Sequence, residues 1–176
     1  MRKVTFSGRQ TQNRYYIMKN RNLVHTDDWA TPPYFYDELN KCFKFNFDPT
    51  PFNHDVNKWD GLKIEWKERN YINPPYSQKL KEAFVIKAIE ESKKGKLCVM
   101  LLPVSTSTKL YHKHILPNTD DITFIFKRIP FIGINTKGQY VNWHLWDKKA
   151  PDNVEHVKNS GMHDSMVVVF KPSNCY

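Results

Sequence analysis

Cysteine is scarce in this 176-residue chain, and its three cysteines, Cys42, Cys98 and Cys175, lie far apart. An odd number at such spacing argues against a disulfide framework and a cysteine-rich zinc site, and it favours a reducing compartment. Long hydrophobic runs are also missing, since the longest, Leu97–Leu102, is far too short to cross a bilayer. The polar amino-terminal segment lacks the apolar core of a signal peptide. We therefore expect a cytoplasmic protein without membrane contact.

Two kinds of ligand site lack support in the sequence. No glycine-rich phosphate loop is present, so nothing indicates hydrolysis of nucleoside triphosphates. The seven histidines show no metal-ligand spacing with carboxylates. We therefore expect neither a nucleotide-hydrolysing site nor a metal centre.

Acidic residues are absent from the first 26 residues, whereas basic residues such as Arg9 and Arg14 are frequent there. Residues 1–25 are therefore predicted to form a basic amino-terminal arm, for which DNA contact and a loose terminus are both open interpretations. The formal net charge of the whole chain is +9. Such a surplus favours a polyanionic partner, because neutralised phosphates release counterions. A basic protein without such a partner is the alternative interpretation of the charge.

Enough apolar material is present for one core, because 40% of the residues are hydrophobic and 14% are aromatic. Residues 26–176 are therefore expected to form a single domain, with a loop-like insertion at about 133–162. Helical periodicity, helix start and stop signals and apolar runs predict the remaining elements. The predicted helices cover residues 33–43, 78–94 and 107–116, and the predicted strands cover 45–47, 62–66, 71–72, 97–102, 122–126 and 166–170.

Strands and helices alternate in the middle of the chain, which predicts an α/β fold with a mostly parallel sheet. No clear helix precedes the closing strand, so an antiparallel terminal strand is expected. Ligands of such sheets bind at the carboxyl ends of the strands. This places three segments on one functional edge: Asp48-Pro49, Asn73–Tyr76 and Pro103-Val104-Ser105.

The tetrapeptide Asn73-Pro74-Pro75-Tyr76 directly follows a predicted strand. Two consecutive prolines fix φ and remove two N–H donors, so the loop is stiff and presents carbonyl oxygens. Such a loop suits the binding of an aryl –NH2 group. If the Asn73 side-chain oxygen and the Pro74 carbonyl each accept one N–H, the nitrogen can pyramidalise and direct its lone pair at an electrophilic methyl group. Tyr76 would stack on the base. A proline-rich turn without chemistry is the alternative.

At these residues the sequence resembles the phage and prophage family of Dam-like DNA N6-adenine methyltransferases. The resemblance covers about residues 28–171 and consists of short motifs in a fixed order. These are Asp28-Trp29-Ala30-Thr31-Pro32, Phe47-Asp48-Pro49, Asp60-Gly61-Leu62 with Trp66, Asn73-Pro74-Pro75-Tyr76-Ser77, Leu101-Leu102-Pro103 with Ser105-Thr106, Phe124-Ile125 with Arg128 and Phe131, and Ser165–Phe170.

The resemblance implies an abbreviated Rossmann-like class I fold and S-adenosylmethionine as the cofactor. It implies that Thr31-Pro32 holds the methionine end of the cofactor, with helix capping as a shared role. It further implies that Asp48-Pro49 is the first cofactor loop, where a carboxylate could bind the cofactor's amino group. Asp60 would accept from the cofactor's adenine amino group. Turn formation at Asp48-Pro49 and a solvated acid at Asp60 are the alternatives.

Double-stranded DNA is the partner that the resemblance implies, and the chain is expected to act as a monomer or weak dimer in a bacterial cytoplasm. Candidate DNA contacts are Arg9, Arg14, Arg128, Trp143, Lys148 and Lys149. The chain departs from larger adenine methyltransferases, because it lacks a Phe-x-Gly-x-Gly loop and an obvious ribose-binding acid. Cytosine N4, an RNA adenine or a protein glutamine amide stay open as acceptors, and so does a non-catalytic DNA-binding relative.

Overall fold

The computed structural model describes residues 27, 29–134, 137–141, 154–155 and 163–173. The predicted basic arm at 1–25, with Arg9 and Arg14, lies outside the described residues. So do Trp143, Lys148 and Lys149.

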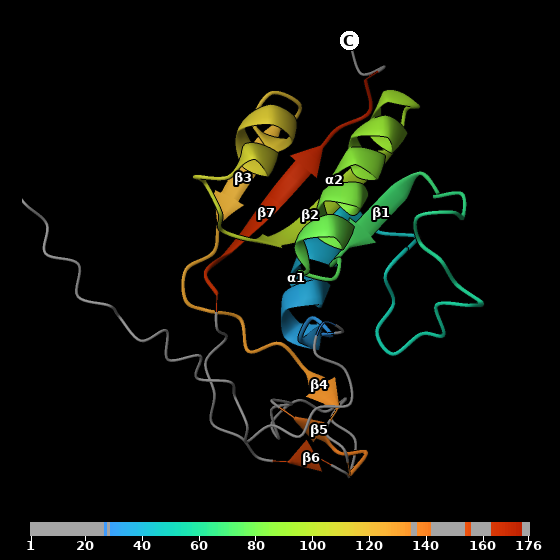
Figure 1. Ribbon diagram of the computed structural model, residues 1–176, viewed down its shortest axis with the longest axis vertical. Helices are drawn as coiled ribbons and strands as arrows, with labels where there is room; N and C mark the ends of the chain where they lie inside the picture. The colour runs from blue at the N-terminus through green and yellow to red at the C-terminus, as the bar shows by residue number, and fades with distance from the viewer. Residues whose placement is uncertain (1–26, 28, 135–136, 142–153, 156–162, 174–176) are drawn as a thin grey trace, which may run out of the picture.

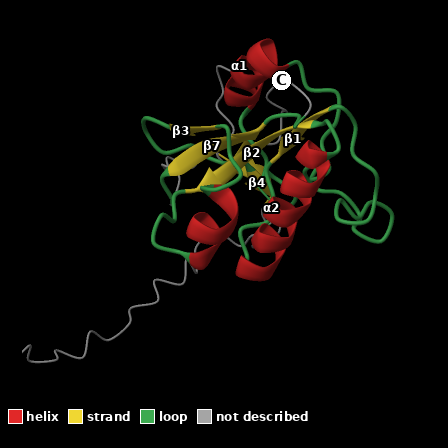
Figure 2. Cartoon of the chain, turned by 90° about the horizontal axis from the view of Figure 1, so that it is seen from above, coloured by secondary structure: helices red, strands yellow, loops and turns green. Residues whose placement is uncertain are grey.

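A four-stranded sheet with the order β1-β2-β7-β3 lies at the centre of the fold (Figure 1). Its strands are β1 (Arg69–Ile72), β2 (Leu97–Pro103), β3 (Asp121–Phe124) and β7 (Ser165–Phe170). The helices α1 (Pro33–Phe43) and α2 (Gln78–Lys93) and the π-helix η1 (Tyr111–Ile115) flank the sheet. Figure 2 shows α1 on one side of the sheet and α2 on the other, so the fold has three layers.

We expected a mostly parallel sheet, and this prediction of the strand pairing is wrong. β1 and β2 pair in parallel, but β7 pairs antiparallel with both β2 and β3. The cause is the position of the closing strand, which lies between β2 and β3 instead of at the sheet edge. Because β2 and β3 both oppose β7, the strands β1, β2 and β3 still run in one direction. The expected antiparallel closing strand is confirmed.

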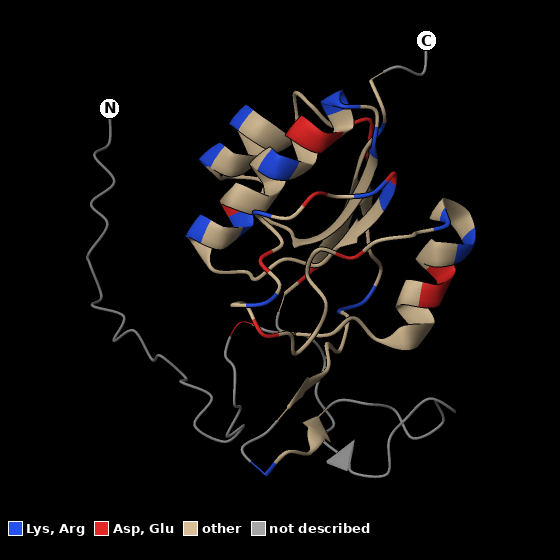
Figure 3. Cartoon of the chain, turned by 90° about the vertical axis from the view of Figure 1, so that its right-hand side faces the viewer, with Lys and Arg blue, Asp and Glu red and all other residues tan. Residues whose placement is uncertain are grey.

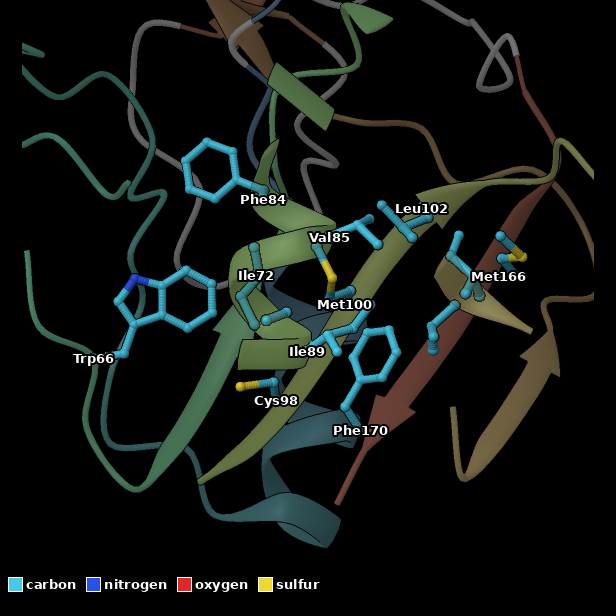
Figure 4. Close-up of a cluster of buried hydrophobic side chains, with 13 residues drawn as sticks. Trp66, Ile72, Phe84, Val85, Ile89, Cys98, Met100, Leu102, Met166 and Phe170 are labelled. Atoms are coloured by element: carbon cyan, nitrogen blue, oxygen red, sulfur yellow. The ribbon is translucent and has the colours of Figure 1, made fainter. Parts of the chain in front are cut away.

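The core consists of two hydrophobic clusters, one on each face of the sheet. Alternate residues of β2 point to opposite faces, which explains why the whole strand is buried. One cluster joins α2 and η1 to the sheet and includes Trp66, Phe84, Met100 and Phe170 (Figure 4). The other packs α1 against Tyr71 and its neighbours on the opposite face. The two clusters hold β1 and β2 rigidly, so the loops that follow these strands start from fixed positions.

Two predicted strands are wrong or much reduced. Residues 45–47 form only one parallel bridge, Phe47 with Asn70, because the Asn46 side chain accepts from the Arg69 N–H at 3.0 Å in place of a backbone carbonyl. Residues 62–64 form a turn and a bend, and residues 65–66 have no regular structure. The carbonyl of Asp60 accepts from residues 63 and 64 and its carboxylate from residue 62, so these backbone donors are already used locally.

The predicted loop-like insertion at 133–162 contains a second, small sheet. Its strands are β4 (Gly133–Ile134), β5 (Tyr140–Val141) and β6 (Val154–Glu155), in the order β4-β5-β6. A pair of hydrogen bonds between Ala30 and Ile132 connects the segment before β4 to the segment before α1. Among the described residues no helix is long and apolar enough to cross a membrane.

Candidate active site

Asn73 is the first residue after β1, at the carboxyl edge of the sheet. Its side-chain Nδ2 donates to the carbonyl of Trp29 at 2.6 Å, and its backbone N–H donates to Thr50 Oγ1 at 3.1 Å. Because the amide nitrogen is held by a carbonyl, the amide oxygen points away from Trp29. Within the described part of the chain, no donor contacts this oxygen. Asn73 therefore presents one oriented acceptor.

The two prolines that follow continue this acceptor surface. Pro74 is buried, whereas Asn73, Pro75 and Tyr76 are partly exposed. No described residue donates a hydrogen bond to the Pro74 carbonyl. The loop is fixed by proline φ angles and packing, and it is still open to a ligand.

Asp27 holds the end of the loop. Its carboxylate accepts from the backbone N–H of Tyr76 at 2.7 Å and of Ser77 at 3.1 Å. These donors lie at the start of α2, where unpaired N–H groups and the helix dipole favour an anion. The side chain of Ser77, the residue at the capping position of α2, makes no capping hydrogen bond. Asp27 takes that role from a position 49 residues away from Tyr76.

The Tyr76 ring meets the ring of Phe131 edge to face, with 5.9 Å between the centroids and an interplanar angle of 86°. Burial, and to a smaller extent the negative charge of Asp27, raises the pKa of the Tyr76 hydroxyl, which stays protonated. Its hydroxyl oxygen is buried and has no hydrogen-bond partner among the described residues. The Tyr76 ring is therefore held by an aromatic contact, whereas its hydroxyl has no hydrogen bond to the described residues.

Thr50 joins the Asp48-Pro49 loop to the Asn73–Tyr76 loop, the candidate catalytic loop. Its hydroxyl donates to Asp48 Oδ1 at 3.1 Å and accepts from the Asn73 N–H. The Thr50 N–H also donates to Asp48 Oδ1, at 2.7 Å. Burial raises the pKa of Asp48 to about 6, although the two bonds from Thr50 act in the opposite direction. A carboxylate with so high a pKa is short of stabilising partners and suits a cationic ligand.

Thr31 is linked to the Asp48 carboxylate through Tyr71. Its hydroxyl is hydrogen-bonded to the Tyr71 hydroxyl, with 2.5 Å between the oxygens. The pKa of Tyr71 is raised by burial and, more weakly, by the charge of Asp48. Thr31 does not cap α1: the capping position is Pro32, whose carbonyl accepts from Phe35 and Tyr36 at 3.0 and 3.1 Å. Thr31, Tyr71 and Asp48 therefore belong to one polar neighbourhood.

Asp60 lies on a turn that rests on the Asp48-Pro49 loop. Its carboxylate accepts from the Leu62 N–H and pairs with Lys63 at 3.0 Å, and this pairing lowers the pKa of Asp60. The next residue, Gly61, is pressed against the loop, since an added Cβ would lie 2.1 Å from the Pro49 carbonyl oxygen. Only glycine permits this approach.

The predicted DNA contact at Arg128 is on the surface. Its Nε donates to Asp164 Oδ1 at 3.0 Å, and both side chains are exposed. The other five candidate DNA contacts, Arg9, Arg14, Trp143, Lys148 and Lys149, lie outside the described residues.

A pocket of about 450 Å³ opens next to the catalytic loop, between the first turns of α2 and the segment before η1. It is lined by Gln78, Lys81, Glu82, Thr108, Lys109 and Leu110. Lysines recur along α2 (Figure 3). The lining does not include Asn73–Tyr76, so this pocket is a neighbour of the catalytic loop and not part of it. Across the part of the chain that the structure describes, no group of three or more His, Cys, Asp or Glu could hold a metal ion.

The sequence analysis missed three residues that hold the site together, namely Asp27, Thr50 and Tyr71. A weak signal existed for Thr50, because a threonine two residues after an aspartate often forms a local side-chain turn. Nothing local indicated Asp27 or Tyr71, since each acts on a residue at least 40 positions away.

Comparison with known proteins adds a family to this geometry. The sequence pattern of the family described as DNA N-6-adenine-methyltransferase (Dam) matches residues 19–174. A DNA N-6-adenine-methyltransferase of Haemophilus phage HP1 (strain HP1c1) is 34% identical over 151 residues, covering 75% of this chain and 85% of the phage protein. No solved structure matches. Together with the Asn73–Tyr76 loop at the carboxyl edge of the sheet, these matches establish that the chain belongs to the DNA N-6-adenine-methyltransferase (Dam) family.

Proposed function

We propose that the Asn73–Tyr76 loop holds the exocyclic amine of an adenine flipped out of duplex DNA while N6 receives a methyl group. Family membership makes the chain an adenine-specific DNA methyltransferase. The observation that carries the catalytic assignment is the fixed orientation of the Asn73 amide. Its nitrogen donates to Trp29, so its oxygen is left as an acceptor.

Two acceptors suit the amine of adenine, which has two N–H donors. Asn73 Oδ1 takes one and the Pro74 carbonyl takes the other. The amine lone pair is delocalised into the ring in free adenine and is a poor nucleophile. Two acceptors on one side favour a pyramidal nitrogen, whose lone pair is available for attack. Phe131 holds the Tyr76 ring edge to face, and Tyr76 would stack on the purine.

S-adenosylmethionine supplies the methyl group on a sulfonium, so the carbon is electrophilic without help from the protein. The residues present fit this cofactor. The Asp48 carboxylate, whose pKa burial raises to about 6, would bind the cationic amino group, with Pro49 fixing the loop. Thr31 and Pro32 would hold the same end of the cofactor. Asp60 would meet the cofactor's adenine amine from the turn that rests on Pro49.

No strong base is required, because the methylated ammonium is acidic and releases its proton to solvent. In the balanced step the N6–CH3 bond forms, the S–CH3 bond breaks and one proton leaves N6. The chain's part in this step is to position the amine and to keep it oriented. Asp27 and Thr50 serve that purpose at the two ends of the loop.

We further propose that the sheet is an abbreviated Rossmann-like class I methyltransferase fold. The parallel pair β1 and β2, joined by α2, supports this proposal, and so does the parallel bridge of Phe47 beside β1. The ligand segments follow the carboxyl ends of these strands, as in doubly wound sheets. The basic charge suits duplex DNA as the partner, with Arg9, Arg14, Arg128, Trp143, Lys148 and Lys149 as proposed contacts. A monomer or weak dimer in a host bacterial cytoplasm is the expected setting.

The test is tritium transfer from labelled S-adenosylmethionine to unmethylated duplex DNA, followed by nucleoside analysis. Asn73→Ala is expected to lower turnover by at least about 100-fold, because it removes one positioned acceptor. Binding of the cofactor should change little. Asn118→Ala is the matched control, since its side chain donates to the His114 carbonyl at the opposite end of β3.

The nucleoside product separates the competing readings. N6-methyladenine in the DNA supports the proposal, whereas N4-methylcytosine would show the same chemistry on another amine. Methylated RNA or a methylated protein amide would likewise point to another acceptor. Salt-sensitive DNA binding without any transfer would indicate a non-catalytic relative. Near-normal turnover of Asn73→Ala would show that the loop has been given the wrong role.

A further inference from the structure

Phe126 is the most exposed large hydrophobic side chain among the described residues, with 88% of its surface accessible to solvent. It lies two residues after β3, on a turn where Lys127 takes a positive φ of 65°. The Lys127 ammonium is 5.6 Å from the centre of the Phe126 ring. This turn therefore offers an exposed aromatic ring and a cation side by side.

The turn belongs to the same edge of the sheet as the catalytic loop. β1, β2 and β3 run in one direction, so the carboxyl ends of β1 and β3 lie at the same edge. Figure 1 shows the chain leaving β3 along this edge toward β4. The segment that begins at Phe126 ends at Phe131, whose ring contacts Tyr76. Three strand spacings separate β3 from β1, about 14 Å, which equals roughly four base-pair steps of DNA.

The charge around Phe126 is complementary to a phosphate backbone. Lys127 and Arg128 follow it directly, and both are exposed. Asp164 is the acid that faces Arg128, at 3.0 Å. This ion pair is exposed to solvent and is therefore weak, so a phosphate can compete for the guanidinium.

We propose that Phe126 inserts between base pairs of duplex DNA a few steps away from the flipped adenine, and that Lys127 and Arg128 bind the adjacent phosphates. This inference rests on the proposed function, because a DNA duplex reaches this edge of the sheet only when the enzyme binds DNA. Extruding a base requires unstacking and bending of the helix. An aromatic wedge lowers the cost of the deformed state by filling the opened step, while neighbouring cations fix the backbone.

A second copy of the chain is the other surface that could cover Phe126. β3 is an edge strand, and Phe124 is also exposed. The two adjacent cations favour DNA, because a twofold contact through this turn would bring like charges of both copies together. The wedge is therefore assigned to the duplex, and self-association becomes an outcome of the test.

The experiment measures helix unwinding without cofactor, so it does not depend on methyl transfer. A nicked plasmid is resealed by ligase in the presence of the protein, and the topoisomers are separated on a gel. We compare the wild type with Phe126→Ala, Phe126→Trp and Leu116→Ala. Leu116 is the control, because it is also exposed, at 51%, but precedes the amino end of β3. DNA affinity, methylation of the same plasmid and molar mass are measured in parallel.

The wild type, Phe126→Trp and Leu116→Ala are expected to lower the linking number, and Phe126→Ala is not. Phe126→Ala should bind DNA about ten-fold more weakly. Lys127→Ala should keep the unwinding but reduce the slope of log affinity against log salt by about 0.9. Unwinding by Phe126→Ala at the wild-type level would overturn the wedge, and so would a wild type that binds and methylates DNA without unwinding it. A fall in molar mass in Phe126→Ala alone would reassign the residue to self-association. A wild type that does not bind DNA would overturn the proposed function together with the wedge.

Discussion

Replacement of Asp48 by asparagine should stabilise the protein above pH 7 while it weakens cofactor binding. Burial raises the pKa of Asp48 from 3.8 to about 6. The folded state therefore binds this proton more tightly than the unfolded state, and folding becomes less favourable as pH rises between these values. The difference of about 2 pKa units corresponds to about 3 kcal/mol. The asparagine side chain would carry no charge and could still accept from Thr50.

Because the pKa of Asp48 is raised, the stability difference between the variant and the wild type should depend on pH. A change in packing alone would not produce this dependence. Well below pH 4 the carboxyl is protonated in both states, so the free energies of unfolding of the wild type and Asp48→Asn should nearly coincide. The advantage of the variant should grow between about pH 4 and 6 and stay near about 3 kcal/mol above pH 7. Urea unfolding at pH 4, 5, 6 and 8 measures the difference. Asp60→Asn is the control, because the pKa of Asp60 is lowered by Lys63 and the sign is opposite.

Two results would refute the idea that burial of the charged Asp48 carboxylate destabilises the fold. One is a variant that is less stable than the wild type at pH 8, and the other is a stability difference that does not change with pH. Calorimetric titration with S-adenosylmethionine tests the second half of the prediction. The wild-type affinity should fall as pH drops below 6, because protonated Asp48 cannot bind an ammonium as an ion. The affinity of Asp48→Asn should be low at every pH. If the variant binds the cofactor as tightly as the wild type, the amino group is bound elsewhere.

Two further substitutions test the support beneath the cofactor loop. Gly61→Ala would force a Cβ against the Pro49 carbonyl oxygen. We therefore expect the free energy of unfolding in urea to fall by about 1–3 kcal/mol and cofactor binding to weaken. A variant with unchanged stability and binding would contradict the close approach of Gly61 to Pro49. Lys87→Met removes the ammonium that donates to the carbonyls of Leu62 and Ile64, at 2.8 and 2.9 Å. The free energy of thermal unfolding should fall by about 2 kcal/mol. Stability equal to the wild type would show that these two hydrogen bonds make no net contribution.

The elements with strong local signals were predictable from the sequence. The helix expected at 33–43 is α1, because proline at its start and a continuous periodic stripe define it locally. The apolar run at 97–102 is β2, and the run at 166–170 is β7, each extended by one residue. Burial on both faces of the sheet explains why these strands are continuous apolar runs.

The order of the strands was not predictable in the same way. Each strand's residues specify burial but not its neighbour, so nothing in 165–170 indicated insertion between β2 and β3. The same holds at the site. The Asn73–Tyr76 loop is recognisable from its own residues, whereas the contacts that orient it come from Trp29, Thr50 and Asp27, which are distant in sequence. The loop proposed to act on the substrate could be recognised because its residues are consecutive, whereas the residues that orient it are scattered along the chain.

The position of Thr50 implies that the two ligand sites are mechanically coupled. One hydroxyl accepts from the backbone of Asn73 and donates to the carboxylate of Asp48. Burial raises the pKa of Asp48 to about 6, so a cation bound there would favour the ionised carboxylate over the protonated one. The Thr50 hydroxyl donates more strongly to an ionised carboxylate, and hydrogen-bond polarisation makes it a better acceptor for the Asn73 N–H. If the proposed roles hold, the Asn73–Tyr76 loop is held most firmly when the Asp48-Pro49 loop has bound the cofactor, which predicts that the methyl donor binds before the adenine is captured.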